Sequence, residues 1–193
     1  MILKSAFDMI LVVTEEGLLQ EMSYSIIYST HTDNVIKLAG QIEAALPKEE
    51  IIFDGRIEAV EDFATKADVI FIGFWTTKNS CDAKIAELLS TLKNRKIAIF
   101  GTCGFGGDEK HFNIVKNNVL KNVDPSNQVL DFYLCLGRIG YEYVHKAKEV
   151  NGDPKVDFHF PMYLKFAKED EGHPTKDELD NVYGWAKSIV EKA

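Results

Sequence analysis

Residues 25–35 read Ser25-Ile26-Ile27-Tyr28-Ser29-Thr30-His31-Thr32-Asp33-Asn34-Val35 and join a predicted strand to a predicted helix. The apolar run stops at a loop of hydroxyl and amide side chains, and apolar residues at helical spacing follow over 35–46. The first N–H groups of a helix have no partner within it and carry the positive end of its dipole. This stretch predicts a rigid phosphate-binding site without a full positive charge. An ordinary helix cap by Thr32 or Asp33 explains the same residues.

Apolar runs and helical patterns alternate along the rest of the chain. Runs typical of strands occur at 25–28, 50–53, 68–74, 96–101 and 129–136. Helical patterns occur at 35–46, 83–92, 111–123 and 174–191. Strands that are apolar on both faces and separated by helices indicate a parallel sheet covered on both sides. We therefore predict a doubly wound α/β fold of five strands with helices on both faces, in which ligands sit at the carboxyl ends of the strands.

Length, charge and cysteine content narrow the class of protein. The chain has 193 residues, a formal net charge of -8 and a pI of about 5.2. This acidic balance argues against nucleic-acid binding and favours partners that present basic patches. The three cysteines, Cys81, Cys103 and Cys135, lack CxxC spacing. We therefore expect reduced thiols in a cytoplasmic protein, with neither a disulfide framework nor a metal site.

Two segments fall outside the alternating pattern. Residues 1–21 are expected to be an N-terminal extension ahead of one domain over 22–193, although an extra strand or helix packed on the domain explains them as well. Their apolar run at 7–13 is too short to span a bilayer. Residues 138–172 form an excursion before the last helix, and its length is typical of a functional segment rather than of a simple connection.

Two further strand ends carry unusual loops. Phe74-Trp75-Thr76-Thr77 places a Trp beside hydroxyl groups, which suits stacking on a flat ring system or a place in the core. Gly101-Thr102-Cys103-Gly104-Phe105-Gly106-Gly107 is rich in glycine, so its backbone can approach a ligand closely or form a flexible turn. The glycine fingerprints of dinucleotide-binding folds and of P-loops are absent from the sequence.

Taken together, these three loops resemble those of the flavodoxin family, over about residues 24–136 and with 174–191 as the family's last helix. Thr30-His31-Thr32-Asp33-Asn34-Val35 lies on the family's [Ser/Thr]-x-Thr-Gly-Asn-Thr loop, with Asp33 in place of Gly and Val35 in place of the final Thr. The resemblance implies the strand order 2-1-3-4-5 and a bound FMN whose ring stacks on Trp75. The cofactor-binding residues that it implies are Thr30, His31, Thr32, Asp33, Asn34, Val35, Phe74, Trp75, Thr76, Thr77, Thr102, Cys103, Gly104, Phe105 and Gly106. Phe105 either covers the second face of the flavin or packs inward.

The resemblance implies electron transport by FMN, with no catalytic acid, base or nucleophile and with a redox partner that docks through a basic surface. We expect the acidic surface near the flavin to disfavour its reduced, anionic form. One alternative is an FMN-dependent NAD(P)H oxidoreductase whose pocket lies in 138–172, with candidates Arg138, Tyr141, His159 and Tyr163. The other is a binding module that has lost its cofactor. Asp33, which adds a charge beside the phosphate, and Val35, which lacks a hydroxyl, motivate this alternative.

Overall fold

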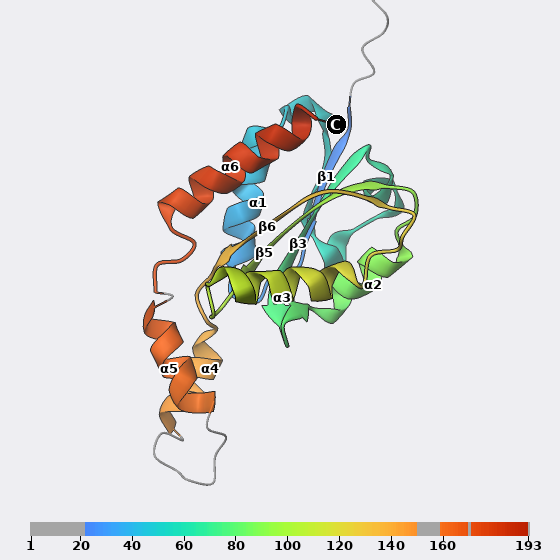
Figure 1. Cartoon of the computed structure of the whole chain (residues 1–193). Coiled ribbons are helices and arrows are strands. Elements are labelled where there is room, and N and C mark those ends of the chain that lie inside the picture. Colours follow the sequence, from blue (N-terminus) through green and yellow to red (C-terminus); the bar gives the residue numbers. More distant parts are fainter. Residues whose placement is uncertain (1–21, 150–158, 170, 193) are drawn as a thin grey trace, which may run out of the picture.

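The computed structural model describes residues 22–149, 159–169 and 171–192, and a parallel sheet lies at its centre (Figure 1). The parallel strands are β1 (Tyr24–Tyr28), β2 (Ile51–Arg56), β3 (Val69–Thr77), β5 (Lys96–Cys103) and β6 (Gln128–Leu136). They lie in the order β2-β1-β3-β5-β6, and each neighbouring pair is parallel. Counted along the chain, these five strands have the order 2-1-3-4-5. The predicted doubly wound fold is therefore confirmed.

Helices cover both faces of the sheet (Figure 1). α1 (Asn34–Ala45) and α6 (Lys176–Val190) pack on one face, and α2 (Ala83–Thr91) and α3 (Glu109–Leu120) pack on the other. Each pair closes its own apolar core against the sheet, which is why the central strands are apolar on both sides. Between β2 and β3 the chain makes only short 3-10 turns, at Ile57–Ala59 and Asp62–Lys66.

A small hairpin extends β3 beyond its predicted end at residue 74. β3 continues to Thr77, and β4 (Ser80–Cys81) returns antiparallel to it. Lys78 and Asn79 form the turn with φ of 48° and 58°, the left-handed conformation that two-residue hairpin turns require. The Asn118 side chain of α3 donates a hydrogen bond to the Asn79 carbonyl at 3.1 Å, which fixes the hairpin against α3.

The predicted excursion forms a pair of helices, α4 (Tyr141–Glu149) and α5 (His159–Glu169). The two pack against each other beyond the lower end of the sheet in Figure 1, where β5 and β6 pass into their loops. The excursion thus places a helical pair at the carboxyl edge of the sheet. Residues 1–21, predicted as an extension, lie outside the described residues. Within the described ranges, no helix has the length and apolar character needed to cross a membrane.

The last helix begins with a capping box that also ties it to β6. The Glu178 amide donates to the Thr175 hydroxyl at 3.3 Å, and the Glu178 carboxylate accepts from the Thr175 amide at 2.6 Å. The same carboxylate accepts from the Leu136 amide at 3.2 Å. One side chain therefore satisfies an open amide at the helix start and another at the end of the edge strand.

We expect Glu178→Ala to lower the free energy of unfolding by about 1–3 kcal/mol, because the half-buried amides of Thr175 and Leu136 lose their acceptor. Asp180→Ala is the matched control. It removes an exposed partner of Lys176 on the same helix, so we expect a change below about 0.5 kcal/mol. Urea unfolding followed by circular dichroism measures both variants. Equal losses in the two would contradict the role of Glu178.

Candidate functional site

A cavity of about 550 Å³ opens at the carboxyl edge of the sheet. All three predicted loops reach it. The predicted residues that line it are His31, Thr32, Asn34, Trp75, Thr76, Thr77, Thr102, Cys103, Gly104 and Phe105. The predicted residues that do not line it are Thr30, Asp33, Val35, Phe74 and Gly106. The loops meet because the carboxyl ends of parallel strands lie at one edge of the sheet.

The N-terminus of α1 lies at this cavity without a side-chain cap. Asp33 precedes the helix in the left-handed conformation, with φ of 58°, and its side chain makes no capping hydrogen bond. The first turn contains no acidic residue. The Thr32 hydroxyl accepts a hydrogen bond from the Asn34 side chain at 2.6 Å. The helix cap by Asp33 that the sequence also allowed is therefore not formed, and the first amides of α1 remain available to an anion.

The Asp33 carboxylate pairs with Arg56 of β2 instead of turning toward the helix amides. The Arg56 guanidinium donates to Asp33 Oδ1 at 3.0 Å, and 70% of the Asp33 side chain is exposed. Val35, the other departure from the family's loop, is fully buried in the core beneath α1. Both side chains are thus directed away from the open amides.

Asn34 connects the start of α1 to the loop after β6. Its side chain is buried and donates to the Thr32 hydroxyl and, at 2.9 Å, to the Arg138 carbonyl. A Cβ atom at Gly137 would lie 3.0 Å from Asn34 Nδ2 and 2.8 Å from the Thr102 Cβ. Glycine is therefore needed where three loops approach one another.

The Thr30 hydroxyl is an unusual polar group in the same loop. Its oxygen is buried and has no hydrogen-bond partner in the described part of the chain. Buried hydroxyls in folded proteins are nearly always hydrogen-bonded, so this one marks a place where a further acceptor would lower the free energy.

Trp75 lies at the cavity wall, half-buried, and its ring stacks on that of His31. The ring centroids are 5.0 Å apart with an interplanar angle of 27°. His31 Nε2 is hydrogen-bonded to the Glu142 carboxylate of α4, and this bond lowers the pKa of Glu142. Tyr143 presents an edge to the same imidazole at 6.3 Å. His31 therefore links the first loop, the Trp and the excursion.

Phe105 extends from the glycine-rich loop toward the excursion. Its ring stacks on Phe166 of α5, with centroids 5.6 Å apart and an interplanar angle of 26°, and lies 5.6 Å from the ring of His111. Gly106 follows with φ of 82°, a conformation that favours glycine. Phe105 is half-buried and lines the cavity.

The three loops did not predict every residue of the wall. The remaining lining residues are Lys78, Asn79, His111, Gly137, Arg138, Ile139, Gly140 and Tyr143. Several of them follow β6, a fourth strand end that the same rule on carboxyl edges points to. Of the pocket candidates in the excursion, Arg138 lines the cavity, whereas Tyr141 does not and is 77% exposed. The side chains of His159 and Tyr163 lie outside the described part.

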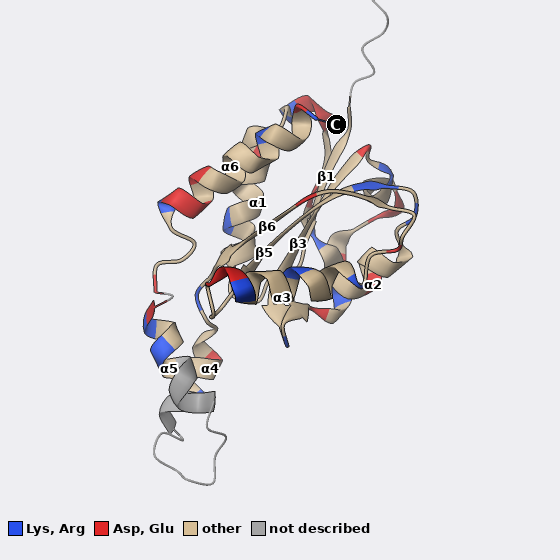
Figure 2. Ribbon diagram, viewed as in Figure 1, with Lys and Arg blue, Asp and Glu red and all other residues tan. Residues whose placement is uncertain are grey.

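The charge of the wall differs from that of the whole chain. None of the described residues that line the cavity is Asp or Glu, whereas Lys78 and Arg138 both line it. The acidic surface expected beside the ligand is therefore not part of the cavity wall itself. Asp33 and Glu142 adjoin the lining residues Thr32 and His31, and other acidic residues lie farther away, for example at the start of α6 (Figure 2).

All three cysteines are buried as free thiols. Burial raises the pKa of Cys81 to about 11 and raises that of Cys135 further above its ordinary value, so both are protonated at neutral pH. Cys103 lines the cavity, with its Sγ 3.1 Å from the Thr76 hydroxyl. Across the described ranges, no group of three or more His, Cys, Asp or Glu side chains is placed to hold a metal ion.

Comparisons with known proteins agree with this architecture. A family model described as a flavodoxin domain matches residues 25–187. The flavodoxin-like domain-containing protein BilS of Clostridioides difficile (strain CD3) is 26% identical over 175 residues, which cover 89% of this chain and 98% of that protein. Among solved structures, the Streptococcus pneumonia TIGR4 flavodoxin is similar with a TM-score of 0.53 and 12% identity, over 88% of this chain and 99% of that one. Flavodoxin 2 from Bacillus cereus is similar with a TM-score of 0.52 and 12% identity, over 89% of this chain and 99% of that one. At this identity the two structures bear on the fold alone.

Proposed function

Because this chain belongs to the flavodoxin domain family, we propose that it binds FMN at the carboxyl edge of its sheet and passes electrons to or from a partner redox enzyme. The observation that carries the proposal is the uncapped N-terminus of α1 beside Trp75, in one cavity. Bound FMN would supply the one- and two-electron chemistry, while the protein binds it and sets its potentials.

The first loop suits the phosphate of FMN. The amides of Asn34, Val35 and Ile36 open the helix and lack a side-chain cap, so they can donate to phosphate oxygens. The Thr30 hydroxyl lies in the same loop but does not line the cavity, so the phosphate contacts that we propose are those of the α1 amides. Asp33 opposes the phosphate weakly, because its carboxylate is exposed and paired with Arg56. These features answer the objection that Asp33 and Val35 raised against cofactor binding.

The other two loops suit the ring of FMN. Trp75 offers an aromatic face at the cavity, and Gly104, which has no side chain, lets the backbone after β5 come close to a ligand. The ring that stacks on Trp75 in the structure is the His31 imidazole. A flavin that uses the same face would displace His31 and break its bond to Glu142.

We also propose that the redox partner docks through a basic surface. The support is the net charge of -8 and the exposure of acidic residues on several elements, among them Glu109 of α3 and Asp177 of α6. In Figure 2 acidic residues colour the start of α6 and the start of α3, and Asp177 and Glu109 belong to these positions. Opposite charges of this kind speed association and align the partners.

A second candidate function is direct oxidation of NAD(P)H by an FMN-containing enzyme. The observation in its favour is that the excursion helps to enclose the cavity through Tyr143 of α4 and through the contact of Phe105 with α5. Steady-state assays on the FMN-loaded chain separate the two. An electron carrier oxidises NADPH only when a separate reductase is added, whereas an enzyme of this class oxidises it alone.

We expect the purified chain to take up FMN and to show a flavin band near about 450 nm. Trp75→Ala should weaken FMN binding about tenfold or more, because stacking on the indole ring is lost. Trp185→Phe is the matched control, since Trp185 packs in the core against Phe71 and Tyr133. Quenching of FMN fluorescence gives the affinities. A chain that takes up no added FMN would overturn the proposed function.

The pairing of Asp33 with Arg56 predicts a reversible effect on FMN affinity. Arg56→Gln should weaken FMN binding about two- to fivefold, because it frees a carboxylate beside the helix start. Asp33→Asn, which keeps the left-handed turn, should change the affinity less than about twofold. The double variant should return to nearly the unaltered affinity. A large gain in affinity from Asp33→Asn alone would show that the carboxylate opposes the phosphate in spite of Arg56.

A further inference from the structure

The cavity carries more positive charge than FMN needs at its phosphate end. Lys78 and Arg138 both line the wall, and within the described part of the chain no carboxylate pairs with either side chain. Two carboxylates beside the wall are already hydrogen-bonded: Glu142 to the His31 ring, and Asp108 to the His111 amide. In a chain of net charge -8, a wall with two cations and no carboxylate is a local exception.

The two cations reach the cavity from opposite faces of the sheet. Arg138 adjoins the phosphate end, because its carbonyl accepts from Asn34 at the start of α1. Lys78 sits at the tip of the β3–β4 hairpin, which Asn118 holds against α3. Since α1 and α3 cover opposite faces, Arg138 reaches the cavity from the α1 side and Lys78 from the hairpin that contacts α3. The single phosphate of FMN would bind at the start of α1 near Arg138, and Lys78 would then have no anionic partner within the described ranges.

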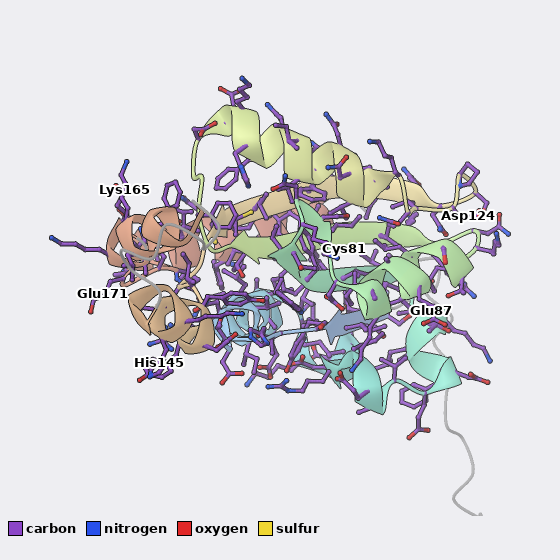
Figure 3. The ribbon with its side chains drawn as sticks, turned by 90° about the horizontal axis from the view of Figure 1, so that it is seen from below. Cys81, Glu87, Asp124, His145, Lys165 and Glu171 are labelled. Atoms are coloured by element: carbon purple, nitrogen blue, oxygen red, sulfur yellow. The ribbon has the colours of Figure 1, made fainter. Side chains whose placement is uncertain are left out.

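The α3 side of the cavity also has an aromatic wall. His111 of α3 lines the cavity, and its ring lies 5.6 Å from that of Phe105. Phe105 in turn stacks on Phe166 of the excursion. In Figure 3, viewed from below, the α4–α5 pair stands at one side of the sheet, and the labelled His145 and Lys165 point outward. The excursion therefore adds the aromatic ring of Phe166 to the wall of the cavity that Lys78 also lines.

We propose that the α3 side of the cavity, marked by Lys78, His111 and Phe105, binds an aromatic organic anion beside the FMN of the proposed function. The anionic group pairs with the Lys78 ammonium, and the ring packs on the Phe105–His111 wall. A carboxylate and a phosphate ester share this chemistry. The inference rests on the proposed function for the placement of FMN at the α1 side and names the class of small molecule that this chain would accept.

The test titrates the FMN-loaded chain with 2-naphthoate, 2-naphthyl phosphate and the neutral 2-naphthamide, at low salt, and follows the change in the flavin spectrum. We expect at least one of the anions to bind about fivefold tighter than the amide, the value of one nearby unit charge in water-like surroundings. Added salt should reduce this preference. The anion that binds tighter identifies the carboxylate or the phosphate ester as the preferred group.

Lys78→Gln should reduce the preference for the anion to about twofold or less. Lys84→Gln is the matched control, because Lys84 lies on α2 in an exposed pair with Glu58 and does not line the cavity. It should leave the preference unchanged.

Three results would overturn the inference: equal binding of the amide and both anions, no spectral change at millimolar anion, or an unchanged preference in Lys78→Gln. A chain that does not hold FMN defeats the proposed function instead. The same titrations are then read from tryptophan fluorescence of the FMN-free chain, with Trp75 at the cavity, and the same outcomes decide the anion site.

Discussion

The left-handed turn at Asp33 is the constraint on which the site depends. It leads into α1 without a side-chain cap, so that the positive end of the helix dipole stays open at the cavity. Two neighbours make this arrangement tolerable. Arg56 draws the Asp33 carboxylate away, and Asn34 ties the turn to the loop after β6. The open amides at the start of α1 thus follow from the conformation of one backbone residue rather than from a cluster of charges.

The excursion changes what a flavodoxin-like sheet presents at its carboxyl edge. In this chain α4 and α5 contact the cavity loops through His31 and Phe105. The two helices therefore enclose part of the cavity at the carboxyl edge of the sheet. A carrier that meets its partner protein needs an exposed cofactor edge, whereas a small molecule needs a wall. The α4–α5 pair provides such a wall beside His31 and Phe105.

The sequence predicted the sheet and most of the loops, because long apolar runs and hydroxyl- or glycine-rich strand ends are direct signals of buried strands and ligand loops. It did not predict β4, whose two residues follow from the turn at Lys78 and Asn79. The helices of the excursion were also missed, since α4 has few apolar residues to give a helical period. Phe74 lies in the core because successive side chains of a strand face opposite ways, and Val35 does so because it lies on the face of α1 that packs on the sheet; loop composition reveals neither.

The proposed FMN site puts the phosphate at the start of α1. Backbone amide NMR shifts of the labelled chain can test this placement, with FMN compared against riboflavin, which has the same ring and no phosphate. We expect large shifts of the Asn34, Val35 and Ile36 amides with FMN, and much smaller shifts of the same amides with riboflavin. Equal shifts with both ligands, or shifts with FMN confined to other residues, would contradict it.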